Sequence, residues 1–347
     1  MLQEHTFQYS SSFPLESGES LPGFQLFYTT FGTLNAQRDN VIWVCHALTG
    51  NANMLDWWPG LFGKDKLYNP ADYYVVCANM LGSCYGSTGP LTINPLTNNP
   101  FFHTFPSITN RDIVRAFDKL RKHLNLEQIH TLIGGSMGGQ QALEWSIMQP
   151  ELAQNLIQIA SNAQHSPWGI AFNESQRMAI QSDASWKEND PQAGLEGMRT
   201  ARAIALLSYR HYRTYHKTQQ DAPSDQLSGY RAASYQRYQG EKLARRFNAF
   251  SYWILSCAMD SHHVGRGRSS VLSTLQRVKA KTLQVGIKTD VLFPPDEQRF
   301  LAEHIPGSQM AIIDSDYGHD GFLLEFAQLS RYITRFYREK NTSVKVP

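Results

Sequence analysis

The sequence has few cysteines, almost no net charge and no long apolar run. None of its four cysteines follows C-x-x-C spacing, which argues against a zinc knuckle, a dithiol redox site and a disulfide scaffold. A formal net charge of +2 is too balanced for electrostatic binding of nucleic acid. No apolar stretch approaches 18 residues, and the first residues lack basic and apolar regions, so we expect no membrane span and no signal peptide. We expect a soluble, globular protein of a reducing compartment.

Nucleotide and metal motifs are missing as well. The glycine-rich segment 81–90 lacks the Gly-Lys-Ser/Thr ending of a phosphate-binding loop, and residues 134–139 do not read G-x-G-x-x-G. Residues 262–268 add no acidic residue or cysteine to the histidine pair at 262–263, so we interpret this segment as an exposed turn and expect no metal. The sequence therefore predicts no bound cofactor.

Short apolar runs that alternate with helical patterns dominate the first half of the chain. Hydrophobic residues make up 41% of the 347, which is enough for a large core. The pattern predicts an α/β fold with a mostly parallel sheet. Strands are predicted at 41–45, 73–78, 131–133, 156–159, 282–287 and 310–313, and helices at 109–124, 294–305 and 321–338. The helix at 109–124 is expected to begin with Thr109 capped by Asp112.

Between about residues 163 and 270 the buried-strand runs stop. Amphipathic, aromatic-rich helical stretches are predicted there, at about 174–182, 194–209 and 227–259. The simplest organisation is one α/β core domain, residues 1–162 and 271–347, interrupted by a helical domain at 163–270. We expect this insertion to cover one edge of the sheet as a lid. Its apolar surface also predicts that it joins two copies of the chain.

Residues 134–138 read G-G-S-M-G and fit G-x-S-x-G, the nucleophile elbow. A predicted strand precedes them and a predicted helix follows them, which is the context that this motif requires. We interpret Ser136 as the nucleophile. A glycine-rich structural turn is the alternative reading.

A serine nucleophile needs a base and an orienting carboxylate, in the chain order Ser, Asp/Glu, His for this kind of fold. His319 lies in a glycine-flanked loop after the last predicted strand, and Asp290 directly follows the strand before it. We predict that Asp290 orients His319 as the base. His304 is the competing histidine, and Asp296, Asp314 and Asp316 are the competing carboxylates.

The oxyanion of the reaction needs backbone donors. One is expected to be the N–H of Met137, which follows the nucleophile, and the other the N–H of Leu48 in the loop after the 41–45 strand. His46 in that loop is expected to brace it, because the position of the base is already filled.

Together these segments resemble homoserine O-acetyltransferases of the α/β-hydrolase superfamily. The resemblance is carried by C-H-A-L-T-G at 45–50, the 81–90 segment, G-G-S-M-G-G at 134–139 with Q-A-L-E-W at 141–145, V-G-R-G at 264–267 and Y-G-H-D-G at 317–321. It implies an α/β-hydrolase fold with a helical lid and acetyl transfer from acetyl-CoA to the hydroxyl of L-homoserine in methionine biosynthesis. It also implies a cytoplasmic homodimer joined through the lid, with acetyl-CoA as a substrate and no separate cofactor.

Carried over residue by residue, the resemblance assigns nucleophile, acid and base to Ser136, Asp290 and His319. It assigns binding of the acceptor to Arg202 and Asp320, for which the alternatives are an ion pair with a lid glutamate and a cap on the last helix. Two positions depart from the family: His263, where an aspartate is common, and Gln140.

Related enzymes use succinyl-CoA as donor, or serine or a cephalosporin alcohol as acceptor, and a plain esterase uses water. Elbow and triad are common to all of them. The lid favours a transferase, because it can exclude water and position an alcohol. We therefore expect a two-step reaction through an acyl-serine.

Overall fold

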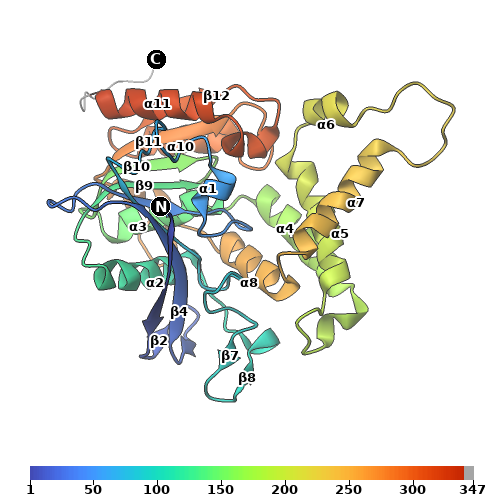
Figure 1. The fold of residues 1–347 in the computed structure, drawn as a ribbon, viewed down its shortest axis with the longest axis horizontal. Coiled ribbons are helices and arrows are strands. Elements are labelled where there is room, and N and C mark those ends of the chain that lie inside the picture. Colours follow the sequence, from blue (N-terminus) through green and yellow to red (C-terminus); the bar gives the residue numbers. More distant parts are fainter. Residues whose placement is uncertain (340–347) are drawn as a thin grey trace.

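An eight-stranded sheet forms the centre of the molecule (Figure 1). The computed structural model describes residues 1–339, so the last eight residues of the predicted core domain lie outside the described part. The strand order is β1-β4-β6-β5-β9-β10-β11-β12. The six strands from β6 to β12 in this order run parallel, β4 is antiparallel to β6, and β1 is antiparallel to β4. The expected α/β fold with a mostly parallel sheet is confirmed.

The six predicted strands are all present in this sheet. The strands of the sheet are β1 (Gln3–Tyr9), β4 (Phe24–Gly32), β5 (Val41–Cys45), β6 (Tyr74–Ala78), β9 (Ile129–Gly135), β10 (Ala153–Ile159), β11 (Lys281–Ile287) and β12 (Gln309–Ile313). The antiparallel pair β1 and β4 was not predicted. Two short hairpins lie outside the sheet, β2 (Phe13–Pro14) with β3 (Ser20–Leu21) and β7 (Ile93–Asn94) with β8 (Asn99–Pro100).

Helices cover both faces of the sheet. They are α1 (Met54–Trp57), α2 (Asn110–His123), α3 (Met137–Met148), α9 (Val271–Leu275), α10 (Pro295–His304) and α11 (Phe326–Arg338). The side chains of β5 show the two layers, because Trp43 belongs to the core beneath α2 and α3, whereas Ile42 and Val44 belong to the core beneath α1 and α11. This alternation is what a strand buried on both faces requires. Thr109 and Asp112 form the predicted capping box of α2.

The inserted helices lie together at one side of the sheet, on the right in Figure 1. They are α4 (Pro167–Gln181), α5 (Leu195–Tyr209), α6 (Tyr212–Gln219), α7 (Arg231–Ala244) and α8 (Ala249–Asp260). The single helical stretch predicted at 227–259 is two helices, because Asn248 caps a new helix by accepting a hydrogen bond from Ser251 N–H. The helix α6 was not predicted.

The two ends of the insertion pair with each other. His165 N–H donates to the His262 carbonyl at 2.9 Å, and Val264 N–H donates to the Ala163 carbonyl at 3.0 Å. Gln164 and His263 form the antiparallel bridge between them. The helices α4 to α8 therefore leave and rejoin the core at one place. Across residues 1–339, no helix is both long and apolar enough to span a membrane.

Candidate active site

Ser136 stands at a sharp turn between β9 and α3. Its backbone has φ 57° and ψ −127°, a conformation that costs energy for any residue with a side chain. The turn is held from the sheet side, since Ser136 N–H donates to the Ile159 carbonyl at 2.9 Å. A Cβ on Gly134 would lie 2.3 Å from the Gly138 carbonyl group, so the turn can be this tight only with glycine there. The serine is 6% exposed at the carboxyl edge of the sheet.

Asp290 and His319 are in contact at the same edge. His319 Nδ1 lies 2.7 Å from Asp290 Oδ2, and both side chains are buried. The other oxygen, Oδ1, accepts hydrogen bonds from Leu292 N–H at 2.8 Å and Phe293 N–H at 2.9 Å. The carboxylate is therefore fixed by two backbone donors and can hold the imidazole in one orientation.

Phe322 connects the histidine loop to the nucleophile turn. Its ring centroid is 5.3 Å from that of His319, and a Cβ on Gly135 would come within 2.7 Å of the same ring. Phe293 stacks on the imidazole from another side, with centroids 5.1 Å apart. Ser136 Oγ itself makes no hydrogen bond to any residue within 1–339. Contacts of this kind often tighten only when substrate binds.

The charge of Asp290 governs the titration of the histidine. Burial by itself would lower the pKa of His319, but the adjacent carboxylate of Asp290 outweighs it and raises that pKa above the ordinary value, with smaller contributions from Asp320 and Glu297. A base that binds its proton more firmly is better suited to accept one from a serine hydroxyl.

The competing residues are engaged elsewhere. His304 lies in the last turn of α10, with Nδ1 2.7 Å from the Phe300 carbonyl. Asp316 pairs with Arg213 at 3.4 Å. Asp314 pairs with Lys288 at 3.7 Å, and Asp296 with Arg299.

The loop after β5 lies against the start of α3. A Cβ on Gly138 would come 2.1 Å from the Cys45 carbonyl oxygen, so the two backbones approach as closely as glycine allows. Leu48 and Met137 are buried, and their amides donate to no acceptor in the part of the chain that the structure describes. His46 in this loop is buried, with Nδ1 2.9 Å from the Ala47 carbonyl, and burial lowers its pKa to about 4. A neutral His46 thus stays within the loop.

The far side of the site comes from the insertion. Tyr209, the last residue of α5, lies with its ring 5.8 Å from that of His319, and the Arg202 guanidinium is 5.2 Å from the centre of the Tyr209 ring. Arg202 forms no ion pair within residues 1–339. Asp320 pairs with Arg210, whose Nε lies 2.8 Å from Oδ2. Sequence reasoning missed Tyr209 and Arg210, although they follow Arg202 at helical spacing.

The turn expected at 262–268 is not exposed at its start. His262 is fully buried, its Nε2 lies 3.1 Å from the Asn162 carbonyl, and burial lowers its pKa to about 3. The expectation is wrong here because this residue belongs to the paired ends of the insertion. Gln140 is also buried, and its amide joins Asn110 and Asn162, each at 3.0 Å.

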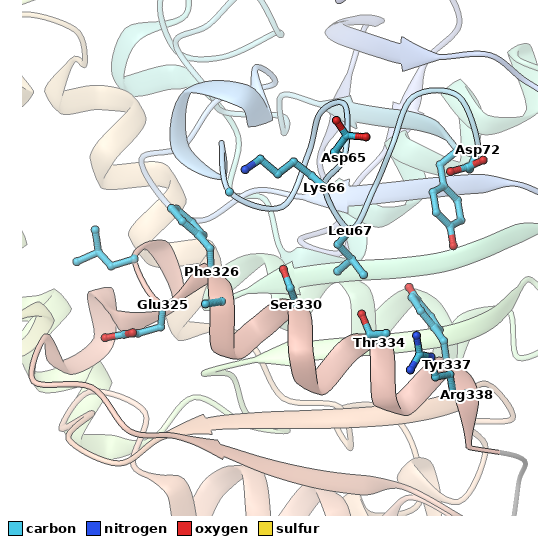
Figure 2. Close-up of a pocket in the computed structure, with 14 residues that line it drawn as sticks. Asp65, Lys66, Leu67, Asp72, Glu325, Phe326, Ser330, Thr334, Tyr337 and Arg338 are labelled. Atoms are coloured by element: carbon cyan, nitrogen blue, oxygen red, sulfur yellow. The ribbon is translucent and has the colours of Figure 1, made fainter.

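A groove of about 1000 Å³ lies elsewhere, between α11 and the segment 60–73 (Figure 2). Lys66 lines one part of it, and Tyr337 and Arg338 line another. None of the predicted triad residues lines this groove. The candidate active site is instead the edge of the sheet at which the loops after β5, β9, β11 and β12 meet.

Comparison with known proteins adds to this geometry. The α/β-hydrolase fold family matches residues 40–326. The chain is 52% identical over 340 residues to the homoserine O-acetyltransferase of Cyclobacterium marinum, covering 98% of this chain and 97% of the relative. The chain belongs to the homoserine O-acetyltransferase family. The resemblance found in the sequence is thereby confirmed.

Solved structures show that this fold serves more than one chemistry. Homoserine O-acetyltransferase from Bacillus anthracis matches with a TM-score of 0.89 at 23% identity, covering 99% of this chain and all of that one. Esterase E22 matches almost as well, with a TM-score of 0.88 at 22% identity, covering 97% of this chain and all of that one. At these identities the likeness concerns the fold alone.

Proposed function

We propose that this enzyme transfers an acetyl group from acetyl-CoA to the hydroxyl of L-homoserine through an acetyl-Ser136 intermediate. The observation that carries the proposal is the 2.7 Å contact between Asp290 and His319 beside a serine at a nucleophile elbow. The 52% identity to the homoserine O-acetyltransferase of C. marinum supports the choice of reaction.

In the first half-reaction, His319 takes the proton of Ser136 as its oxygen attacks the thioester carbonyl. In this proposal the amides of Leu48 and Met137 stabilise the oxyanion, and the dipole of α3 favours negative charge at its N-terminus. The C–S bond then breaks, the thiolate of coenzyme A takes the proton from His319, and the acetyl group stays on Ser136. Asp290 stabilises the imidazolium while it exists.

In the second half-reaction, His319 deprotonates the hydroxyl of the acceptor, which attacks the carbonyl carbon of the acetyl-serine. The bond from that carbon to Ser136 Oγ then breaks, Ser136 takes the proton back from His319, and the acetylated acceptor leaves. L-Homoserine carries a carboxylate and an ammonium group. Arg202 is suited to the carboxylate, because a guanidinium presents two donors to it, and Asp320 is suited to the ammonium. The absence of an ion-pair partner for Arg202 within residues 1–339 favours this role over the alternative of a pair with a lid glutamate.

We further propose a place and an assembly for the enzyme. The reaction would supply an activated homoserine to methionine biosynthesis in the cytoplasm, and it would need no cofactor besides its two substrates. Apolar side chains exposed on the insertion support a homodimer formed through it; they include Trp168, Met178, Leu207, Tyr212 and Tyr238. Light scattering at micromolar concentration should give the mass of a dimer, and a monomer would contradict this assembly.

Steady-state kinetics test the reaction itself. Acetyl-CoA and succinyl-CoA are each assayed with L-homoserine, L-serine and water as acceptors. Acetyl-CoA with homoserine should give the highest kcat/KM and parallel initial-rate lines, and acetyl-CoA alone should add about 42 Da to the protein. Intersecting lines without an adduct would contradict the covalent route.

Hydrolysis is the second candidate function, because a serine at a nucleophile elbow and an Asp–His pair serve a reaction with water equally well. The same experiment separates the two, because an esterase releases acetate from the acetyl-enzyme at a rate that added homoserine does not change.

A further inference from the structure

Arg210 lies where the insertion meets the loop after β12 that carries His319, which we call the catalytic loop. It follows the last residue of α5 as the C-cap, and its Nε is 2.8 Å from Asp320 Oδ2. Asp320 directly follows His319 in the chain, and its side chain is only 11% exposed. The carboxylate beside the base therefore has a cation from the insertion as its partner.

The backbones are as close as the side chains. Gly318, which precedes His319, has φ +63°, and a Cβ there would lie 2.9 Å from His211 N and 3.0 Å from Arg210 C. Four residues after Arg210, Thr214 Oγ1 donates a hydrogen bond to the Asp316 carbonyl of the same loop. The end of α5 is thus fixed against the catalytic loop, and the position of Arg210 relative to Asp320 is fixed with it.

The ion pair uses only part of each group. The Nε–H of Arg210 is enclosed but does not point at Oδ2, so this contact is a close ion pair and not an aligned hydrogen bond. No hydrogen bond from any residue within 1–339 reaches Asp320 Oδ1. The carboxylate therefore keeps one oxygen that can accept from a ligand.

The two arginines of this region differ in what they contact. The Arg202 guanidinium lies over the Tyr209 ring at 5.2 Å and has no ion-pair partner within the described chain, whereas Arg210 is committed to Asp320. The Tyr209 ring that Arg202 covers also lies 5.8 Å from the imidazole of the base. An acceptor held here meets a free cation at one end and an oriented anion at the other.

We propose that Arg210 is a positioning residue for the acceptor step, holding Asp320 so that its second oxygen receives the ammonium group of an amino-acid acceptor. The inference rests on the proposed function, which places that ammonium at Asp320, and extends it to a residue of the insertion. Without the guanidinium, the carboxylate would be free to rotate toward the imidazolium of His319. The selectivity for α-amino acids would then fall, while acetylation of Ser136 would not.

The test compares two acceptors that differ by one group. L-Homoserine carries the ammonium, and 4-hydroxybutanoate is the same molecule without it. Arg210→Gln should lower kcat/KM for homoserine by about 10- to 100-fold, the loss expected when a hydrogen bond to a charged group is weakened. The rate of acetyl-enzyme formation from acetyl-CoA and the transfer to 4-hydroxybutanoate should change less than threefold. Arg210→Lys should recover part of the homoserine rate, because it restores a point charge without the fork.

Arg213→Gln is the matched control. Arg213 lies three residues further on and pairs with Asp316 of the same loop at 3.4 Å, but its side chain is 64% exposed. Its substitution should leave the ratio of the two acceptors unchanged. Thermal unfolding of each variant shows whether the fold is kept. If Arg210→Gln does not fold, Arg210→Lys alone tests the inference. It should then show a severalfold rise in KM for homoserine at an unchanged acetylation rate.

Two results would overturn the inference. The first is that the folded Arg210 variant and Arg213→Gln have the same ratio of kcat/KM for homoserine to kcat/KM for 4-hydroxybutanoate. The second is that the Arg210 variant loses the rate of acetylation and the rate of transfer to the same extent. A wild-type acetyl-enzyme that does not react with homoserine would refute the proposed function, and the inference with it. Wild-type transfer to homoserine with an unaffected Arg210 variant would refute the inference alone.

Discussion

Replacement of Asp290 by asparagine tests the triad at its most constrained atom. The change keeps the shape of the side chain and replaces one oxygen by an NH₂ group. Asp290 Oδ1 accepts from two backbone N–H groups, at 2.8 and 2.9 Å, while Oδ2 faces His319 Nδ1 at 2.7 Å. Since the two backbone donors need an acceptor, the amide oxygen of Asp290→Asn must occupy the Oδ1 position. The NH₂ group then faces the imidazole.

An NH₂ group at that position forces Nδ1 to act as an acceptor. The imidazole proton therefore moves to Nε2, and His319 can no longer take the proton of Ser136. A wrong tautomer of this kind lowers kcat by about 10⁴, which corresponds to about 5 kcal/mol of transition-state stabilisation. If the amide were turned the other way, the NH₂ group would face two backbone donors, and the free energy of unfolding would fall by about 2 kcal/mol or more.

The assay measures the rate at which acetyl-CoA alone acetylates the protein, with urea unfolding as the check on the fold. Asp290→Asn should unfold close to wild type and acetylate about 10⁴-fold more slowly. Asp316→Asn, in the neighbouring loop, should acetylate normally. A loss below tenfold in Asp290→Asn, or an equal loss in Asp316→Asn, would refute the assignment.

Two further predictions concern the surroundings of the triad. Gly138→Ala should destabilise the fold by about 1–3 kcal/mol despite the better helix propensity of alanine, because its Cβ would lie 2.1 Å from the Cys45 carbonyl oxygen. The displaced loop should also lower the acetylation rate of the folded protein about 10²-fold. A normal rate would show that this loop does not stabilise the oxyanion. Burial, together with the nearby charge of Asp290, raises the pKa of Glu297 to about 7, so its protonated form stabilises the fold fully below about pH 4.5 and this contribution is lost as the pH rises through about 7. In urea unfolding, the stability advantage of Glu297→Gln over wild type should therefore be about 3 kcal/mol larger at pH 8 than at pH 4.5. An advantage that does not change with pH would show that this carboxyl is ionised at no cost.

The parallel part of the sheet could be predicted because its strands are short apolar runs buried on both faces. Strand β1 could not, since only Phe7 among its seven residues is buried and the others are largely polar. Its pairing with β4 forms it, and that pairing joins residues about twenty positions apart. Hydrophobic periodicity does not detect a strand that is held mainly by its backbone partner.

The candidate site divides in the same way. Ser136, Asp290 and His319 each lie within six residues after the end of a strand, so their chain order and the parallel sheet already place them at one edge. The ion pair of Arg210 with Asp320 joins residues 110 positions apart, one of them in the insertion. This ion pair forms only because α5 ends next to the loop that carries Asp320, and the local sequence pattern does not predict where a helix ends in space.

The paired ends of the insertion make it a replaceable module. Because residues 163–165 lie beside 262–264, a different helical unit of any length can be joined at the same two points without stretching the chain, and closing a longer loop there costs little extra entropy. Strands β10 and β11 pair directly with each other on the core side of that junction, so the sheet is complete without the insertion. A replacement must supply a backbone that can lie against Gly318, and apolar side chains in place of Phe247 and Phe250, which pack on Tyr85 and Phe102 of the core domain. New acceptor chemistry can therefore be grafted onto this sheet while the strands that carry the triad keep their sequence.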